Sequence, residues 1–468
     1  MSTTTKSIDR GALIKWLITV LAPLLFFLIP TSEVFTLESR LFIVTSVMAI
    51  ICMAFGLLDN MIPALLLPAA WWILGVVETA PEAYAGFASA TIWVILGAYV
   101  LTIALDDCGI LRRIALFIIE KLGGSYNRTL YAIYIVGVVL GQLCFCSHYF
   151  IMIGLVYGIC QAMGLKPFSK EGVIMMGVGG MAALNVKTFL YQTSNMTLMI
   201  NGMRNVYPDF DITPVQLLIY NCPEFFTAML FIFLLTKICK TKNVKFEGGK
   251  EYFRAEREAM GAMSSAEKKA IVVLIVLMSY VMLQPLHGFD LNYVFIVLPW
   301  ICFFPGVNIA PQKSLDKVKM FFSTFCFAGT CIGIGQVAQA LGFGDLISDI
   351  LGPTLGGMGK VGLTFGVLIF GAFANLLLSP AAMASLLPIG LGNIYNALGY
   401  PPICSILTVN YSLDMIFLPH EVTAYLVLFG FGMMKMKHFI AFFGGKSLFT
   451  LVMFGLIQIP WWHLLGIF

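Results

Sequence analysis

Residues 131–163 read YAIYIVGVVLGQLCFCSHYFIMIGLVYGICQAM, and this stretch decides which kind of fold the chain can adopt. A helix crosses the hydrocarbon core of a bilayer with about 20 apolar residues, so the stretch is too long for one pass. It is also interrupted near its middle by CFCSHY, residues 144–149. The pattern therefore predicts a re-entrant hairpin of two short helices over residues 131–163.

The composition around this hairpin is that of a membrane protein. Of 468 residues, 59% are hydrophobic and 11% are charged, with a mean hydropathy of +0.92. A soluble domain carries about 25% charged residues. The lipid bilayer is therefore the expected surroundings of most of the chain. The formal net charge of +4 is too small and too dispersed to indicate a nucleic-acid partner.

Apolar runs of spanning length occur on both sides of one long polar segment, KFEGGKEYFRAEREAMGAMSSAEKK at residues 245–269. The expected spans are residues 16–29, 41–58, 61–77, 91–105, 172–203 and 215–235 before it, and 271–286, 293–306, 320–341, 403–432 and 439–462 after it. A second broken stretch, residues 361–398, corresponds to the first hairpin. We predict an all-α integral membrane protein with about eleven transmembrane helices plus two re-entrant hairpins.

The recurrence of this pattern divides the chain into two repeats. We expect a first transmembrane helix within residues 1–40, repeat 1 over 41–240 and a cytoplasmic linker over 241–270. Repeat 2 follows over 271–468. Repeat 1 holds the hairpin 131–163 and a broken helix at 172–203, and repeat 2 holds the hairpin 361–398 and a broken helix at 403–432.

Basic residues predict the orientation, because lysine and arginine collect in cytoplasmic loops. Lys6, Arg10 and Lys15 precede the first span, Arg112 and Arg113 follow the fourth, and Lys237 follows the sixth. We therefore expect a multi-pass protein of the cell (inner or plasma) membrane with a cytoplasmic N-terminus and an external C-terminus. Repeat 2 is then inverted relative to repeat 1. In inverted-repeat transporters, substrate and coupling ions bind near the membrane midplane in discontinuous helices.

Polar residues in the two hairpins are the first candidates for such a site. The first tip carries Ser147, His148 and Tyr149, and the second hairpin carries Asn375 and Ser379. Polar groups inside apolar runs are costly unless they have a partner or a function. They could bind an anionic substrate, or they could cap the half-helices where lipid offers no hydrogen bonds. Both roles use the same atoms and remain open.

Lys187 stands about midway along its span, too far from either end to reach water easily. An ammonium at this depth could pair with an anionic substrate or occupy the place of a sodium ion. Alternatively, it could form a structural ion pair with Asp414 or Glu421, the acids of the corresponding span in repeat 2.

A second candidate for coupling follows Pro419, where a helix break frees backbone groups. His420 and Glu421 stand directly after the proline. A desolvated histidine or glutamate titrates readily, so this pair could carry a proton. A hydrogen-bonded packing pair is the structural alternative.

Three strings, ATIWVILGAYVLTIALDDCGILRRIAL, SPAAMASLLPI and LPHEVTAYLVLFG, resemble the divalent anion/sodium symporter family, whose members carry dicarboxylates, citrate or sulfate. The resemblance extends over residues 41–468. Gly97 matches a glycine-rich fourth span, and Arg112 and Arg113 match an arm helix. The resemblance implies a scaffold and a transport domain in each protomer, an elevator mechanism and a homodimer.

In that family, Ser-Asn-Thr tips and the loops of the broken helices form two sodium sites with the substrate between them. This sequence keeps Ser147 at the first tip and Ser379 at the second. Thr193 and Asn195 resemble the first loop, and Thr423 occupies the matching place in the second. The resemblance thus implies a sodium site at Ser147 and Asn195.

We expect a secondary active transporter of a small anion, a di- or tricarboxylate or related oxyanion, coupled to a cation. The alternative is a sodium-independent exchanger or proton-coupled carrier that uses Lys187 in place of a sodium ion. The predicted substrate-binding residues are Ser147, His148, Tyr149, Lys187, Asn195, Asn375, Ser379 and Thr423. The predicted coupling residues are Ser147, Thr193, Asn195, Ser379, Asp414, His420 and Glu421. Because the chain lacks a GxxxxGK[ST] phosphate loop and clustered metal ligands, we expect neither an enzyme nor a cofactor other than sodium.

Overall fold

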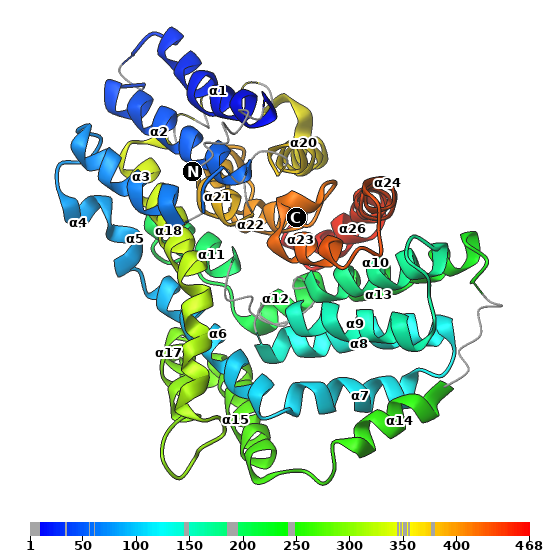
Figure 1. Cartoon of the computed structure of the whole chain (residues 1–468). Helices are drawn as coiled ribbons and strands as arrows, with labels where there is room; N and C mark the ends of the chain where they lie inside the picture. Colours follow the sequence, from blue (N-terminus) through cyan, green and yellow to red (C-terminus); the bar gives the residue numbers. More distant parts are fainter. Residues whose placement is uncertain are drawn as a thin grey trace, which may run out of the picture.

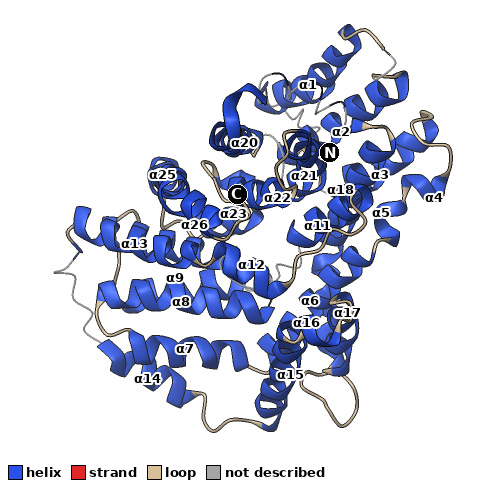
Figure 2. Cartoon of the chain, turned by 180° about the vertical axis from the view of Figure 1, so that it is seen from behind, coloured by secondary structure: helices blue, strands red, loops and turns tan. Residues whose placement is uncertain are grey.

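The computed structural model describes residues 10–32, 35–55, 57–59, 61–144, 149–184, 195–241, 249–343, 346, 349, 353, 356–375 and 380–468. Throughout these residues the secondary structure consists of helices joined by turns and loops, with no strand (Figures 1 and 2). The all-α prediction is confirmed.

The helices before the polar segment match the expected spans, with short additions. They are α1 (Arg10–Leu24), η1 (Leu25–Leu28), α2 (Leu37–Ala54), α3 (Met61–Ile73), α4 (Ala80–Ala83), α5 (Ala85–Ala88), α6 (Ala90–Asp107), α7 (Ile110–Leu122), α8 (Tyr126–Cys144), α9 (Tyr149–Ala162), α10 (Lys170–Leu184), α11 (Asn195–Val206), α12 (Pro214–Asn221) and α13 (Pro223–Ile238).

The remaining helices begin within the polar segment itself. They are α14 (Gly249–Ala259), α15 (Ser265–Met282), α16 (Gln284–His287), α17 (Asn292–Ile301), η3 (Gln312–Phe321), α18 (Phe322–Ala340), η4 (Gly356–Met358), α20 (Gly359–Ala374), α21 (Pro380–Ala397), α22 (Ile403–Ser412), η5 (Pro419–Glu421), α23 (Thr423–Gly430), α24 (Met436–Phe439), η6 (Ile440–Gly444), α25 (Gly445–Met453), η7 (Phe454–Gln458) and α26 (Ile459–Leu464).

Four helical stretches of the described chain are long and apolar enough to cross a bilayer unbroken: Gly11–Leu28, Ala90–Asp107, Pro214–Ile238 and Met436–Leu464. Six shorter apolar stretches of 10–17 residues also lie in the described helices. The predicted hairpin tips and the first predicted helix break lie outside the described residues, so the two hairpins and the number of spans remain predictions. A backbone break at membrane depth is tolerated only where protein or a cavity surrounds it.

The two halves pack against each other in matching pairs. Helix α6 packs against α17, and α3 packs against α18. Around them, α5 contacts α18 while η3 contacts α6. In Figure 1 these helices form one column, which ends at α15. Each pair joins an element of the first half to an element of the second, so this core belongs to neither half alone.

The broken segments pack within their own half before the break and across the two halves after it. Helices α8 and α9 both pack against α10, and α20 and α21 both pack against α22. Beyond each break the partners change: α11 packs against α21 and α22 of the second half, whereas α23 packs against α9 and α10 of the first. The second part of each broken helix therefore completes the other half's bundle.

Close helix packing explains the glycine that the sequence singled out in the fourth span. A Cβ atom at Gly97 would clash with the carbonyl oxygen of Phe295, so α6 and α17 can approach this closely only with hydrogen at that position. Small residues at helix crossings are the usual device for such approaches in membranes.

The polar segment contains a helix that is fixed to the first half. Helix α14 lies along α7 (Figure 1), where Arg112 contacts Glu256 at 2.8 Å and Arg257 contacts Glu120 at 2.5 Å. These ion pairs connect residues that are more than 130 positions apart in the chain. The linker is thus a packed element.

Candidate functional site

Four helices begin directly after an interruption of the apolar chain. Helix α9 starts at Tyr149 and α21 at Pro380, each beyond a predicted hairpin tip. Helices α11 and α23 start at Asn195 and Thr423, beyond the breaks in the two discontinuous helices. Only for α23 are the residues before the start described, and Val422 precedes it in an extended conformation. The N-terminus of a helix carries a partial positive charge and unpaired N–H groups, so the start of α23 can attract an anion.

The break between α22 and α23, residues 413–422, is described in full and is called here the second break. Asn375, the last residue before the second hairpin tip, donates from Nδ2 to the carbonyl oxygens of Leu413 at 3.2 Å and Met415 at 3.5 Å. The Asn375 side chain is buried, and its Oδ1 atom has no hydrogen-bond partner among the described residues. Asn375 thus links the second hairpin to the second break.

Glu421 holds the other end of the same loop. Its Oε1 atom accepts hydrogen bonds from the backbone N–H groups of Phe417 at 3.0 Å and Leu418 at 2.6 Å. The residue is 5% exposed, and its Oε2 atom has no partner in the described part of the chain. One carboxylate oxygen of Glu421 therefore stabilises the break.

An ion pair closes the second break from the side of the last span. Lys446 of α25 pairs with Asp414, and the two side chains are 7% and 10% exposed. The neighbouring Ser447 donates to the carbonyl oxygen of Ile416 at 3.1 Å. Two adjacent residues of α25 therefore bind this loop.

Further polar residues surround this ion pair. Tyr411 is 1% exposed and interacts electrostatically with both Asp414 and Glu224, a buried acid on α13. Tyr425 on α23 interacts electrostatically with Asp414 and Glu421. Ionisable residues gathered at such depth in a membrane protein mark a functional site more often than a structural one.

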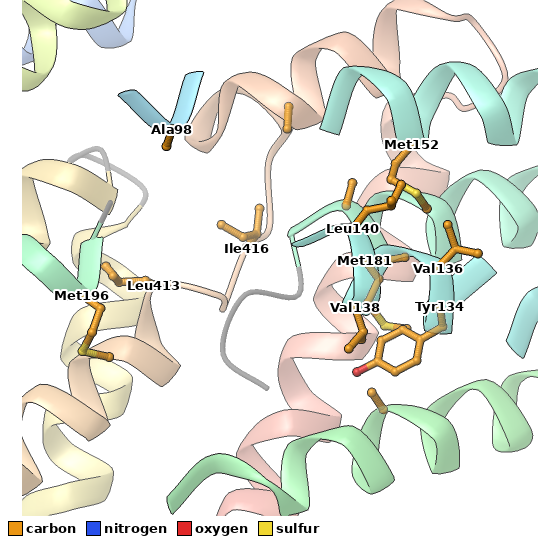
Figure 3. Packing of buried hydrophobic residues seen from close by; sticks show 14 of the residues in the cluster. Ala98, Tyr134, Val136, Val138, Leu140, Met152, Met181, Met196, Leu413 and Ile416 are labelled. Carbon is orange, nitrogen blue, oxygen red and sulfur yellow. The ribbon is translucent and has the colours of Figure 1, made fainter. Parts of the chain in front are cut away.

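Apolar side chains enclose the second break on both sides (Figure 3). Leu413 and Ile416 project from the loop, with Met196 of α11 towards one side of the picture and Leu140 and Met181 towards the other. All five belong to one buried cluster that joins the two halves. Such a shell lowers the local dielectric constant and strengthens each polar interaction inside it.

The predicted site residues divide according to the part of the chain that the structure describes. Ser147, His148, Lys187, Thr193 and Ser379 lie outside the described residues. The backbones of His420 and Thr423 lie at the second break, in η5 and at the start of α23, but their side chains are not among the described ones. The sodium site predicted at Ser147 and Asn195 and the predicted role of Lys187 therefore remain predictions.

The other five predicted residues, Tyr149, Asn195, Asn375, Asp414 and Glu421, take defined places. Tyr149 and Asn195 are the half-buried first residues of α9 and α11. Asn375, Asp414 and Glu421 meet at the second break through the contacts given above. The structure thus brings together three residues that are separated by up to 46 positions in the sequence.

Sequence reasoning missed the lysine of this site. One of its two interpretations of Lys187 was an ion pair with Asp414 or Glu421, and Lys187 lies outside the described residues. Within the described chain, Lys446 pairs with Asp414. The signal was present, because Lys446 interrupts the apolar run FFGGKSLFTLVM just as Lys187 interrupts its own span. Glu224 gave the same signal in the sixth span and was also not singled out.

The long apolar helices of the described chain are those expected of a multi-pass membrane protein. The family described as the sodium:sulfate symporter transmembrane region matches residues 11–468. The chain therefore belongs to the sodium:sulfate symporter family, and the resemblance stated from its sequence is confirmed.

Two further comparisons found similar proteins. A membrane protein of Cupriavidus necator is 24% identical over 316 residues, which cover 66% of this chain and 61% of that relative. The crystal structure of the Alcanivorax borkumensis YdaH transporter is similar with a TM-score of 0.55 and 15% identity, covering 97% of this chain and 98% of that one. The second likeness concerns the fold alone.

Proposed function

We propose that this protein is a secondary active transporter of a small anion, a di- or tricarboxylate or a related oxyanion such as sulfate, coupled to a cation. The observation that supports this proposal most is that Asn375, Asp414 and Glu421 gather at the second break, directly before the start of α23. A helix start beside such a break offers N–H donors and partial positive charge to an anion.

The substrate would lie between the two hairpin tips and the two breaks. Asn375 and Glu421 support this placement, because each uses one side-chain atom to hold the second break and keeps another buried atom for a ligand. Asn195 and Tyr149, at the starts of their helices, are the corresponding candidates in the first half. Ser147, Ser379 and Thr423 are proposed to complete the substrate and sodium ligands.

The architecture proposed for this function is an inverted repeat with an elevator movement. The reciprocal pairs, α6 with α17 and α3 with α18, support a pseudo-twofold relation between the halves. The hairpins and broken helices would form the moving transport domain, and the remaining spans the scaffold of a homodimer in the cell membrane. The chain would begin in the cytoplasm and end outside.

A sodium-independent or proton-coupled mechanism is the second candidate. The Lys446–Asp414 pair favours it, because a lysine already neutralises an acid at the proposed site. Glu421 or His420 would then exchange the proton, and Lys187 would replace a sodium ion in the first half. Flux in this case would respond to pH or to internal substrate and would be indifferent to sodium.

The test is uptake of radiolabelled succinate, citrate and sulfate into liposomes that contain the purified protein, with and without a sodium gradient and at two pH values. Saturable uptake that accelerates when the liposomes are preloaded with the same anion is expected from a carrier. Sodium-driven accumulation supports the first mechanism, and sodium-independent exchange supports the second. Absence of flux for all three anions, from protein that remains monodisperse, would refute the proposed substrate class.

A further inference from the structure

The last span carries a lysine, Lys446, in its apolar interior. Lys446 is buried, and it lies ten residues from the start of the helical stretch Met436–Leu464. At 1.5 Å per residue this is about 15 Å from the helix start, beyond easy reach of water. A charge at this depth persists only with a partner, and Asp414 is that partner.

The helix geometry of the last span directs this lysine to the second break. The π-helical turn η6 ends at Gly444, two residues before Lys446. A π turn inserts one residue and rotates everything that follows around the helix axis, and such turns are frequent at functional sites. The rotated turn brings Lys446 to Asp414 and Ser447 to the Ile416 carbonyl oxygen.

The location of Asp414 is one where a cation is favoured. It follows the C-terminal end of α22, which carries the partial negative charge of the helix dipole, and the next residues are unwound. In transporters with discontinuous helices, such C-terminal ends and unwound carbonyl groups coordinate sodium or protons. In this chain, Asn375 satisfies the carbonyl oxygens of Leu413 and Met415, and Lys446 satisfies the Asp414 carboxylate.

We propose that Lys446 is a resident cation of the second break, bound where a sodium ion would otherwise neutralise Asp414. The second half of the site then takes no sodium ion, and any coupling ion binds in the first half. The inference deepens the proposed function and rests on it only in locating the second break at the transport site.

The experiment measures sodium binding without transport. The melting temperature of the purified full-length protein is followed in sodium chloride and in choline chloride at equal ionic strength, for wild type, Lys446→Gln and the double variant Asp414→Asn/Lys446→Gln. Lys437→Gln, an exposed lysine of the same span, is the matched control. The expected result is that sodium raises the melting temperature of Lys446→Gln by about 1–3 °C more than that of wild type, because the freed carboxylate binds the ion.

The double variant is expected to lose this gain, since it has no carboxylate to bind sodium, and the control should behave as wild type. Equal sodium responses in wild type and folded Lys446→Gln would overturn the inference. If Lys446→Gln is isolated folded only in sodium and not in choline, the inference is supported. If it folds in neither while the double variant folds in both, sodium cannot replace the lysine and the inference is wrong.

These outcomes are independent of the proposed function. A chain that carries none of the three anions would still show, or fail to show, the sodium response of Lys446→Gln. Conversely, the wild-type flux experiment can succeed whether or not Lys446 stands in for a cation.

Discussion

Removal of the Glu421 side chain tests whether this residue stabilises the second break, couples transport to a cation, or does both. In Glu421→Ala, the backbone N–H groups of Phe417 and Leu418 lose their acceptor. A buried donor without an acceptor costs about 1–3 kcal/mol, so two of them predict a loss of about 2–6 kcal/mol. Glu421→Gln keeps an oxygen for both donors and should lose less than about 1 kcal/mol.

The assay is thermal unfolding of the purified variants combined with flux in liposomes. Glu258→Ala is the control, because its ion pair with Arg254 is exposed and is worth at most about 1 kcal/mol. The expected pattern is a lowered melting temperature for Glu421→Ala alone, and an altered cation or pH dependence of flux for both Glu421 variants.

Two results would contradict this reasoning in different ways. If Glu421→Ala has the same melting temperature as wild type, the two backbone hydrogen bonds do not stabilise the second break. If Glu421→Gln is stable and transports with unchanged cation and pH dependence, the second carboxylate oxygen has no part in coupling, and the residue is a structural cap.

Three other predictions concern separate parts of the molecule. Gly97→Val should destabilise the protein by about 1–3 kcal/mol through overpacking, whereas Gly154→Ala, where a Cβ would meet nothing within 4 Å, should melt as wild type. Lys187→Ala should abolish flux and leave the protein monodisperse; normal flux would exclude this lysine from the site. The hydrogen bond from Arg257 lowers the pKa of Glu120 from its usual 4.5, so the pair stabilises the docking of α14 fully above pH 4.5 and less as the pH falls through the lowered pKa. Hydrogen exchange of α14 should therefore accelerate only in acid, and the Glu120→Gln variant should show no such pH step.

Hydropathy located most of the fold because the cost of a polar group in lipid is a local property of the sequence. The break that follows Ser412, which is described in full, falls where polar residues and a proline interrupt an apolar run. This feature depends on a few neighbouring residues, so the sequence alone is sufficient to find it.

The contacts of the site were less accessible to this reasoning, because they depend on which distant segments meet. A single lysine changes the mean hydropathy of the last span very little, so hydropathy does not reveal Lys446. Nothing in the periodicity of this span indicates the π turn that precedes Lys446 and its contact with Asp414. The same holds for α14, whose ion pairs with α7 join residues far apart in the chain. The residue types identified candidate side chains, but only the tertiary structure shows which of them form ion pairs.

The reciprocal packing of the two halves has a consequence for how the protein is made. A ribosome inserts the first half before the second exists, and α3, α6, α10 and α11 then lack the surfaces that cover them in the finished protein. During that interval the nascent chain exposes helix faces and broken backbone to lipid, a state that insertion chaperones and membrane proteases recognise. Maturation is thus complete only after the final helices arrive, and a chain that stops early offers the cell a substrate for degradation.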